Sequence, residues 1–452
     1  MTIWNGLSGV DTSLSAKQEI QYIVQPGGKL TGTIRVPGDK SISHRAIMLG
    51  AIADGVTEVT GFLEGEDALS TLSAFRKMGV MIEGPKNGCI TVHGVGMHGL
   101  SLPTDTLDLG NSGTSIRLLC GLLAGQKFNT ILKGDDSLAK RPMGRVIDPL
   151  VEMGAVIGSD KGKVPLYVQG GKDLSAITYE LPMASAQVKS CLLFAGMYAK
   201  GKTTITEPAP TRDHSERMLT GMGYPIQVDG NKVTIEGGGK LTATEIDVPS
   251  DISSATFFIV GATIAKGSDI TLKHVGINPT RTGVINILRQ MGANITISNE
   301  RKTGGEPVAD IRVRYAVLNG IDVPVEQVPL AIDEFPAIFI AAACADGVTV
   351  LTGAEELRVK ESDRIKAMAD GLKLLGIDAS ATHDGMIIYG GMIGSGEVDS
   401  LGDHRIAMSF AIAGLQAGGT IVIRNCTNVK TSFPNFVDLA TDAGLVIEEH
   451  DD

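Results

Sequence analysis

The sequence predicts an α/β protein made of two domains and six similar units of about 70 residues each. The first observation behind this prediction is length, because 452 residues exceed what one ordinary hydrophobic core holds. The second is an alternation of apolar segments of helical length with segments rich in β-branched residues. The third is a set of glycines that recurs in the same order in all six units.

The first helix of each unit is apolar over most of its length and ends near a glycine. The first copy, HRAIMLGAIADGVTEVTG, begins at His44 and changes from a helical pattern to alternating β-branched residues. A glycine after the last helical turn commonly adopts the left-handed conformation, so we expect a helix stop at each of these positions. The six glycines, 66 to 80 residues apart, are Gly55, Gly125, Gly201, Gly267, Gly347 and Gly419.

A second helix in each unit ends in the same way. Its glycine follows that of the first helix by 22 to 29 residues, and the six positions are Gly79, Gly154, Gly223, Gly292, Gly376 and Gly444. Each unit is therefore predicted to run strand–helix–strand–helix–strand–strand. Such units are longer than the usual repeat of a solenoid, so three units in each of two domains, with a cleft between them, suit the chain better.

Composition argues against several classes of protein. The formal charge of −11 disfavours a nucleic-acid partner, although a few focused cations could still bind an anionic substrate. The N-terminal segment lacks a charged leader with an apolar core, and the longest apolar runs are about half a membrane span. We therefore expect a cytoplasmic protein without membrane contact. Its five cysteines lack metal-ligand spacing and are expected to be buried free thiols: Cys89, Cys120, Cys191, Cys344 and Cys426.

Polar and charged residues gather where the apolar helices begin. Helix N-termini carry free backbone N–H groups and the positive end of the helix dipole, so they attract anions. Lys40 and Arg45 oppose that dipole, which indicates a bound anion. Several such helix starts together predict one site for a multiply anionic ligand where the helices converge. The segments are GDKSISHR (38–45), GNSGTSIR (110–117), MASAQVK (183–189), SDISS (250–254), IDEFP (332–336), GDHR (402–405), KRPMGR (140–145), TRDHSER (211–217), NPTRTG (278–283) and RVKESDR (358–364).

Each segment also has a purely structural explanation. Asp39, Asn111, Asp251, Asp333 and Asp403 could be N-caps, which Asp and Asn favour. Capping is the preferred explanation for Asp251 and Asp403, whereas both explanations stay open for Asp333. NSGTSIR could be a glycine turn, KRPMGR a surface turn, and KESDR a solvated helix face with i,i+3 ion pairs.

Several common enzyme signatures are missing from the sequence. No P-loop, nucleophile elbow, zinc pattern or dinucleotide fingerprint occurs. His44, His214 and His404 do not have metal-like spacing and are expected to lie behind the site or at the surface.

Beyond about residue 28 the chain resembles the EPSP synthase family, the 3-phosphoshikimate 1-carboxyvinyltransferases. The motifs that carry the resemblance are PGDKSISHRA, GNSGTSIRL, KRPMGRV, PMASAQVKS, TRDHSERML, IDEFP, ELRVKESDRI and DHRIAMSF, in the family's order. SAQVKS and TRDHSE are similar to the bacterial group called class II. The resemblance implies the two-domain enolpyruvyl transferase fold, with three βαβαββ units per domain around an interdomain cleft. It implies one discontinuous domain, 1–38 and 251–452, which begins with an extension over 1–20, and a second domain, 39–250.

The resemblance also implies a reaction. The family transfers the enolpyruvyl (carboxyvinyl) group of phosphoenolpyruvate (PEP) to the 5-hydroxyl of shikimate 3-phosphate and releases phosphate, by addition and elimination through a tetrahedral ketal. This step belongs to the shikimate pathway, which leads to chorismate and the aromatic amino acids. The two substrates carry up to about six negative charges, which would explain the cations at the helix starts. A monomer without metal or organic cofactor is expected, and glyphosate is expected to compete with PEP.

Individual residues are implied by position in the matched motifs. Asp333 is the expected base for the attacking hydroxyl, Glu361 the expected acid for the PEP methylene, and Lys40 reaches both substrates. Arginine suits both substrates because its fork matches carboxylate and phosphate. The residues implied for shikimate 3-phosphate are Lys40, Ser41, Arg45, Ser185, Ala186, Gln187, Arg212, Asp333 and Lys360. Those implied for PEP are Lys40, Asn111, Gly113, Thr114, Arg141, Gln187, Arg364 and Arg405.

Two alternatives stay open. A related enolpyruvyl transferase acts on UDP-N-acetylglucosamine, but it usually carries a cysteine before the arginine matched by Arg141, and KGDDSLAKRP has none. A non-catalytic phosphometabolite-binding protein could keep the fold, but a binder of anions gains nothing from Asp333 and Glu361. Lys430 lies one residue out of register with a family lysine before a TFP turn, so it is left unassigned.

Overall fold

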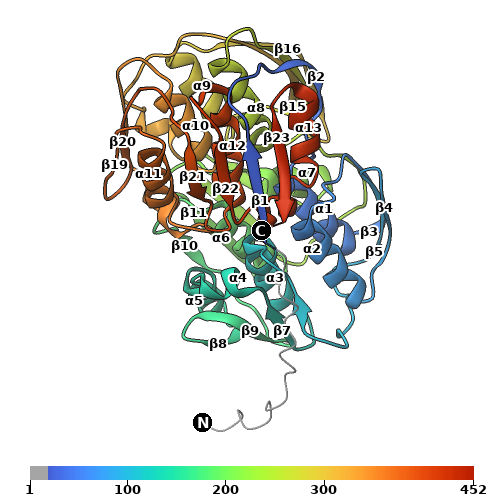
Figure 1. Cartoon of the computed structure of the whole chain (residues 1–452). Coiled ribbons are helices and arrows are strands. Elements are labelled where there is room, and N and C mark those ends of the chain that lie inside the picture. The colour runs from blue at the N-terminus through green and yellow to red at the C-terminus, as the bar shows by residue number, and fades with distance from the viewer. Residues whose placement is uncertain (1–18, 452) are drawn as a thin grey trace.

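The computed structural model describes residues 19–451 (Figure 1). Their buried side chains form two hydrophobic cores. One core uses buried residues between 42 and 248. The other combines buried residues between 20 and 36 with those between 252 and 447. Accordingly, the blue strands β1 (Ile20–Val24) and β2 (Thr31–Ile34) lie among the yellow-to-red elements in Figure 1. Most of the extension expected over 1–20 lies outside the described residues.

The predicted α/β architecture with six similar units is confirmed. Among the described residues, five sheets have the same order of four strands, in which the first two strands are parallel and the other neighbours antiparallel. The sixth sheet lacks only the first strand, and the parallel bridges Asn319↔Asp346 and Asp322↔Val350 stand in its place.

The three units of the 42–248 core contain the following elements. The first has strands β14 (Glu245–Asp247), β3 (Asp54–Thr60), β5 (Cys89–Val95) and β4 (Met81–Lys86), with helices α1 (Lys40–Ala51) and α2 (Glu66–Lys77). The second has β6 (Leu107–Asp108), β7 (Thr130–Lys133), β9 (Lys163–Gln169) and β8 (Val156–Asp160), with α3 (Gly113–Ala124), α4 (Asp136–Lys140) and α5 (Gly144–Glu152). The third has β10 (Thr178–Glu180), β11 (Lys202–Thr206), β13 (Lys232–Glu236) and β12 (Ile226–Asp229), with α6 (Ala186–Gly196) and α7 (His214–Gly221).

The other core also contains three units. The fourth unit has β2, β15 (Asp269–Gly276), β17 (Glu306–Arg314) and β16 (Asn294–Thr303), with α8 (Ile252–Ile264) and α9 (Gly283–Gln290). The fifth has β18 (Val348–Leu351), β20 (Met386–Tyr389) and β19 (Ala379–Ala381), with α10 (Phe335–Ala343) and α11 (Arg364–Leu374). The sixth has β21 (Gly396–Asp399), β22 (Ile421–Arg424), β1 and β23 (Ile447–Asp451), with α12 (His404–Ala413) and α13 (Phe436–Ala443). Short 3₁₀ helices are η1 (Val325–Gln327), η2 (Glu355–Val359), η3 (Gly414–Gln416) and η4 (Thr427–Thr431).

Three units take one strand from a distant part of the chain, which the repeat pattern alone does not predict. β14 completes the first sheet by pairing in parallel with β3, and β2 completes the fourth by pairing with β15. β1 lies between β22 and β23 in the sixth sheet. Each of these strands pairs far from its sequence neighbours because the chain enters one core, leaves it and returns.

The chain passes between the two cores along two adjacent segments. Asp39 donates its backbone N–H to Pro249 (2.8 Å), and Asp251 donates to Pro37 (2.9 Å). These bonds hold the starts of α1 and α8 side by side. The domain limits at 38/39 and 250/251 stay a prediction.

The second set of glycines behaves as predicted, since all six have positive φ between 79° and 117°. In the first set the prediction is wrong at two positions, where no left-handed conformation occurs. Gly125 has φ −86°, and a side chain there would collide with the ring of Tyr198. At Gly419 an added Cβ would lie 2.8 Å from Cβ of Ser395. Close packing, and not backbone conformation, explains glycine at these two sites.

All five cysteines are free, but the expectation that all are buried is wrong. Cys89 is exposed because it follows the tight turn between β4 and β5, and Cys344 is partly buried. Within residues 19–451 no helix is long and apolar enough to cross a membrane.

Candidate active site

Six helices, one from each unit, begin around a single cavity between the two cores. Residues at or beside the N-termini of α1, α3, α6, α8, α10 and α12 all line it. These helices are apolar because they are central; all thirteen residues of α8, for example, are buried. The sequence therefore combines an apolar helix body, which fills the core, with a polar start, which faces the cavity.

The N-cap hypothesis holds for some of the aspartates and not for others. Side chains of Asp39, Asp251 and Asp403 cap α1, α8 and α12. Ser112, rather than Asn111, caps α3. Asp333 caps no helix, because α10 begins after Glu334 and has no side-chain cap. Asp333 is thus free for another role.

The cavity is strongly positive although the chain is acidic. Nine lysines and arginines and five aspartates and glutamates line it, which leaves a formal charge of +4. A low-dielectric cleft focuses such charge, so anionic ligands are attracted in spite of the overall charge of −11.

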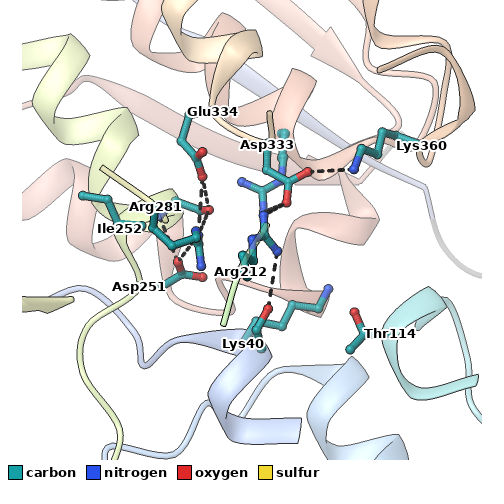
Figure 2. Close-up of polar contacts among 12 residues, drawn as sticks. Lys40, Thr114, Arg212, Asp251, Ile252, Arg281, Asp333, Glu334 and Lys360 are labelled. Atoms are coloured by element: carbon teal, nitrogen blue, oxygen red, sulfur yellow. Dashed lines mark hydrogen bonds and ion pairs between the residues drawn. The ribbon is translucent and has the colours of Figure 1, made fainter. Parts of the chain in front are cut away.

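Asp333 is surrounded by four cations from both sides of the cavity. Figure 2 shows two of them, Arg212 and Lys360, beside its carboxylate. It pairs with Arg212 of the 42–248 part, and its Oδ1 lies 3.4 Å from Lys360 Nζ and 3.4 Å from Arg364 Nη1. Arg405 Nη2 is 3.9 Å from Oδ2. Burial raises the pKa of Asp333, but these charges outweigh burial and hold the pKa well below its usual value. Asp333 is therefore an ionised carboxylate.

Glu361 bridges two arginines that come from opposite parts of the chain. Its Oε1 lies 3.2 Å from Arg141 Nη1 and its Oε2 lies 2.7 Å from Arg364 Nη2. Burial raises the pKa of Glu361, but the two arginines, with His404 and Lys40, lower it well below its usual value. Without an anionic ligand, Glu361 thus neutralises the arginines itself.

The cavity arginines are oriented by further hydrogen bonds. Arg364 donates from Nε to Asp403 Oδ2 (2.8 Å), and Arg141 donates from Nη2 to Asn111 Oδ1 (2.6 Å). Lys40 pairs with the buried carboxylate of Asp67. Such contacts fix cationic groups in advance, which lowers the cost of ordering them around a ligand.

Gln187 and Gly113 shape the wall formed by α3 and α6. Gln187 accepts from Arg117 Nη1 (2.5 Å) and donates to Thr114 Oγ1 (3.0 Å). A Cβ on Gly113 would lie 2.9 Å from Arg141 Nη1 and 3.1 Å from Arg117 Nη1. Any larger residue at position 113 would therefore push on these guanidinium groups.

Most residues implied for the substrates line the cavity, and two do not. Arg45 is buried behind it and donates to Ser215 Oγ (2.7 Å), Ser190 Oγ (2.8 Å) and the Ser41 carbonyl (2.8 Å). Asn111 also lies behind it and holds Arg141. The residues that do line it are Lys40, Ser41, Gly113, Thr114, Arg141, Ser185, Ala186, Gln187, Arg212, Asp333, Lys360, Glu361, Arg364 and Arg405.

Other lining residues had no assigned role: Asp67, Arg117, Arg145, Arg281, Glu356 and His404. All except Asp67 belong to the sequence motifs quoted above, so the sequence already placed them in segments expected to line the site. Asp67 lies in the first turn of α2, where an acidic residue is ordinary. Lys430 pairs with Glu449 (2.8 Å) and is not among the lining residues.

The histidines lie deeper than the sequence indicated. His44 is buried and lies 2.8 Å from Thr71 Oγ1, and His404 lines the cavity. His214, Asp213 and Glu306 together have a geometry that could hold a metal ion. Several of their atoms already have protein partners, because His214 Nδ1 lies 2.8 Å from Glu306 and Arg217 donates to Asp213 (2.9 Å).

The fold and the anion-binding cleft define an enolpyruvyl transferase. The structure superposes on the enolpyruvyl transferase NikO from Streptomyces tendae with a TM-score of 0.76 over 96% of this chain and 99% of that chain, at 16% identity. It matches EPSP synthase from Acinetobacter baumannii with a TM-score of 0.86 and 59% identity, over 95% of this chain and 100% of that chain.

Within this class the sequence selects one family. Residues 24–439 match the family model of EPSP synthase (3-phosphoshikimate 1-carboxyvinyltransferase), and the chain belongs to that family. Relatives named 3-phosphoshikimate 1-carboxyvinyltransferase include those of Methylococcus capsulatus (65% identity, 95% of this chain and 99% of the relative) and Alkalilimnicola ehrlichii (64%, 96% and 97%). The chain is therefore a transferase of the shikimate pathway that joins PEP to shikimate 3-phosphate, and UDP-N-acetylglucosamine is not favoured as acceptor.

Proposed function

We propose that the residues around this cavity bind shikimate 3-phosphate and PEP together and carry out carboxyvinyl transfer with Asp333 and Glu361 as base and acid. The observation that carries the proposal is that each of these carboxylates pairs with an arginine from across the cleft, Arg212 or Arg141. Anionic substrates would replace these carboxylates as partners of the arginines.

Shikimate 3-phosphate is assigned to the side of the cavity built by α1 and α6. Ser41, Ser185 and Gln187 offer hydroxyl and amide groups at helix starts, where phosphate is favoured. Arg212 and Lys360 add charge near Asp333. Arg45 supports this wall from behind through Ser41 and Ser190.

PEP is assigned to the side between Gly113 and α12. Arg141, Arg364 and Arg405 can hold its carboxylate and phosphate by bidentate contacts, and Thr114 lies on the same wall. Lys40 reaches the region shared by both substrates. Glyphosate is proposed to compete with PEP for these arginines.

The proposed reaction has two stages. Asp333 accepts the proton of the attacking hydroxyl, the oxygen bonds to C2 of PEP, and Glu361 delivers a proton to the methylene carbon, which gives a tetrahedral ketal. The C–O bond to phosphate then breaks and phosphate leaves, while the methyl group returns a proton to the Glu361 carboxylate, which forms the enol ether of the product. Because PEP takes over Arg141 and Arg364, the pKa of Glu361 rises on binding and the carboxyl can hold the proton it must donate.

We also propose that the protein acts in the cytoplasm as a monomer with domains 1–38 plus 251–452 and 39–250, and that shikimate 3-phosphate draws the domains together. The cavity uses residues of both cores, so a ligand that spans it favours the closed arrangement. Small-angle scattering with and without this substrate tests closure, and an unchanged radius of gyration would contradict it.

Phosphate release is the test of the proposed reaction. The purified protein is mixed with both substrates in the presence of a chelator, and each substrate is omitted in turn. Release that requires both substrates is expected. Release with PEP alone, or none despite binding of PEP in calorimetry, would overturn the assignment.

A further inference from the structure

The segment NPTRTG (278–283), just before α9, contributes an arginine to the cavity although no substrate contact is assigned to it. Arg281 is 3% exposed, and its guanidinium has partners at both ends. Nη1 donates to Asp39 Oδ2 (3.0 Å), while Nη2 donates to Ser253 Oγ (2.6 Å) and Asp251 Oδ1 (3.2 Å) and lies 3.5 Å from Glu334 Oε1. Figure 2 shows Arg281 beside Asp251 and Glu334, next to the Arg212–Asp333 pair.

These contacts join helix starts from both cores. Asp39 caps α1 of the 42–248 core, whereas Asp251 caps α8 and Glu334 precedes α10 of the other core. Asp39 and Asp251 lie where the chain crosses between the cores. Burial raises the pKa of Asp251, and the negative charge of Asp39 raises it further. Their mutual repulsion requires a cation between them, and Arg281 supplies it.

The same loop makes a second contact across the cleft. Asn278 donates from Nδ2 to Asp213 Oδ1 (2.6 Å) of the 42–248 part and to Glu306 Oε2 (3.0 Å) of its own part. The backbone N–H of Arg281 donates to the carbonyl of Asn278 (2.8 Å), which closes the loop into a turn. Asn278 thus contacts Asp213 at the start of α7, and Arg281 contacts Asp39 at the start of α1.

Three of the residues that Arg281 and Asn278 contact are sequence neighbours of proposed site residues. Asp39 precedes Lys40, Asp213 follows Arg212, and Glu334 follows Asp333. Displacing the loop would therefore shift Lys40 and Arg212 relative to Asp333, although neither Asn278 nor Arg281 needs to touch a substrate.

We propose that Arg281, supported by Asn278, is a positioning residue for carboxyvinyl transfer. It holds the two domains together where the chain passes between them, and it fixes the positions of Lys40 and Arg212 relative to Asp333. This inference rests on the site proposed above. Removing one member of a buried ion cluster also lowers stability, so the test needs kinetic readouts that a loss of stability alone would not change.

The test compares Arg281→Lys with the wild type in steady-state kinetics. Lysine keeps the positive charge, but its single ammonium group cannot contact Asp39 and Asp251 at the same time as the planar guanidinium of arginine does. We expect kcat to fall roughly ten- to a hundredfold, the scale on which a misplacement of about 1 Å slows catalysis. The KM values for both substrates should rise, because Lys40, Arg212 and Asp333 are proposed ligands of shikimate 3-phosphate and Lys40 is also a proposed ligand of PEP.

Two further variants separate positioning from folding. Arg312→Lys is the matched control, because Arg312 forms an exposed ion pair with Asp269 in the same domain (2.6 Å) and should leave kinetics unchanged. Asn278→Ala removes only the contact of the loop with Asp213 and Glu306, so it should change kcat and KM in the same direction but by less. This variant still tests the proposal if Arg281→Lys fails to fold.

The outcomes are distinct. Unchanged kcat and KM in Arg281→Lys, or a loss explained entirely by a lower fraction of folded protein with both KM values unchanged, overturns the inference. If the wild type itself fails to release phosphate from the two substrates, the proposed function fails instead.

Discussion

Glu361 and Arg141 form an ion pair across the cleft, with Oε1 and Nη1 3.2 Å apart. The same carboxylate contacts Arg364 at 2.7 Å, so it occupies the arginines proposed to hold PEP. In the substrate-free protein this contact keeps Glu361 ionised, whereas the proposed acid must carry a proton. We therefore expect substrate binding and protonation of the proposed acid to be coupled, because both depend on Arg141 and Arg364.

Replacing Glu361 with glutamine tests this link. Glutamine keeps the size and can still contact the arginines, but it cannot donate the proton, so kcat should fall about 100- to 10,000-fold. Calorimetry should show shikimate 3-phosphate bound as in the wild type. Glu355→Gln, on the exposed side of η2, is the matched control and should keep full activity. Undiminished turnover in Glu361→Gln would rule out this residue as the acid.

Asp39 is expected to make stability depend on pH. Burial raises its pKa, but the charges of Arg281, His214 and Arg212 and the hydrogen bond from Ile42 lower it to about 2 from an ordinary 3.8. A lowered pKa contributes stability that is complete above about pH 4 and disappears as pH falls through about 2. Asn can still cap α1, but its amide cannot replace the carboxylate beside Arg281.

We therefore expect Asp39→Asn to lower the free energy of unfolding by about 2 kcal/mol at pH 7. The difference between variant and wild type should shrink as pH falls below 4. Urea titrations at several pH values measure it, and a difference that is the same at pH 7 and pH 3 would contradict the expectation.

Gly113→Ala should weaken binding of PEP and of glyphosate. The new methyl group would lie 2.9 Å from Arg141 Nη1 and 3.1 Å from Arg117 Nη1, so both guanidinium groups must move. A strain of about 0.5–1.5 kcal/mol corresponds to a rise of roughly two- to tenfold in the KM for PEP. Inhibition assays give the glyphosate effect, which should be larger than that for PEP because glyphosate is the longer molecule. Gly221→Ala, with no atom within 4 Å of the added carbon, is the control.

Lys189 is expected to stabilise the wall that carries Ser185 and Arg212. Its buried ammonium lies 2.9 Å from Glu207 and 2.6 Å from Glu216. Lys189→Met would leave both carboxylates buried without their cation and should cost about 3–5 kcal/mol in the free energy of unfolding. Lys202→Met, which removes an exposed pair with Glu236 (3.7 Å), should cost less than about 1 kcal/mol. Denaturant unfolding of both variants measures the contrast.

The sequence alone determined the repeated unit and most of the cavity lining. Helices, helix stops and caps depend on neighbours within a few residues, so the local sequence is enough to predict a helix that ends before Gly79 or begins after Asp251. For the same reason, the polar residues at the helix starts predict one shared cavity from the sequence alone.

Only the tertiary structure decided which distant segments meet. β1, β2 and β14 complete sheets far from their chain neighbours, and Asp67 reaches the cavity from a helix start that the sequence did not single out. It also showed that Gly125 and Gly419 are needed for close packing. These facts depend on long-range pairing and on space between elements, which the chain acquires only when the two cores form and close on each other.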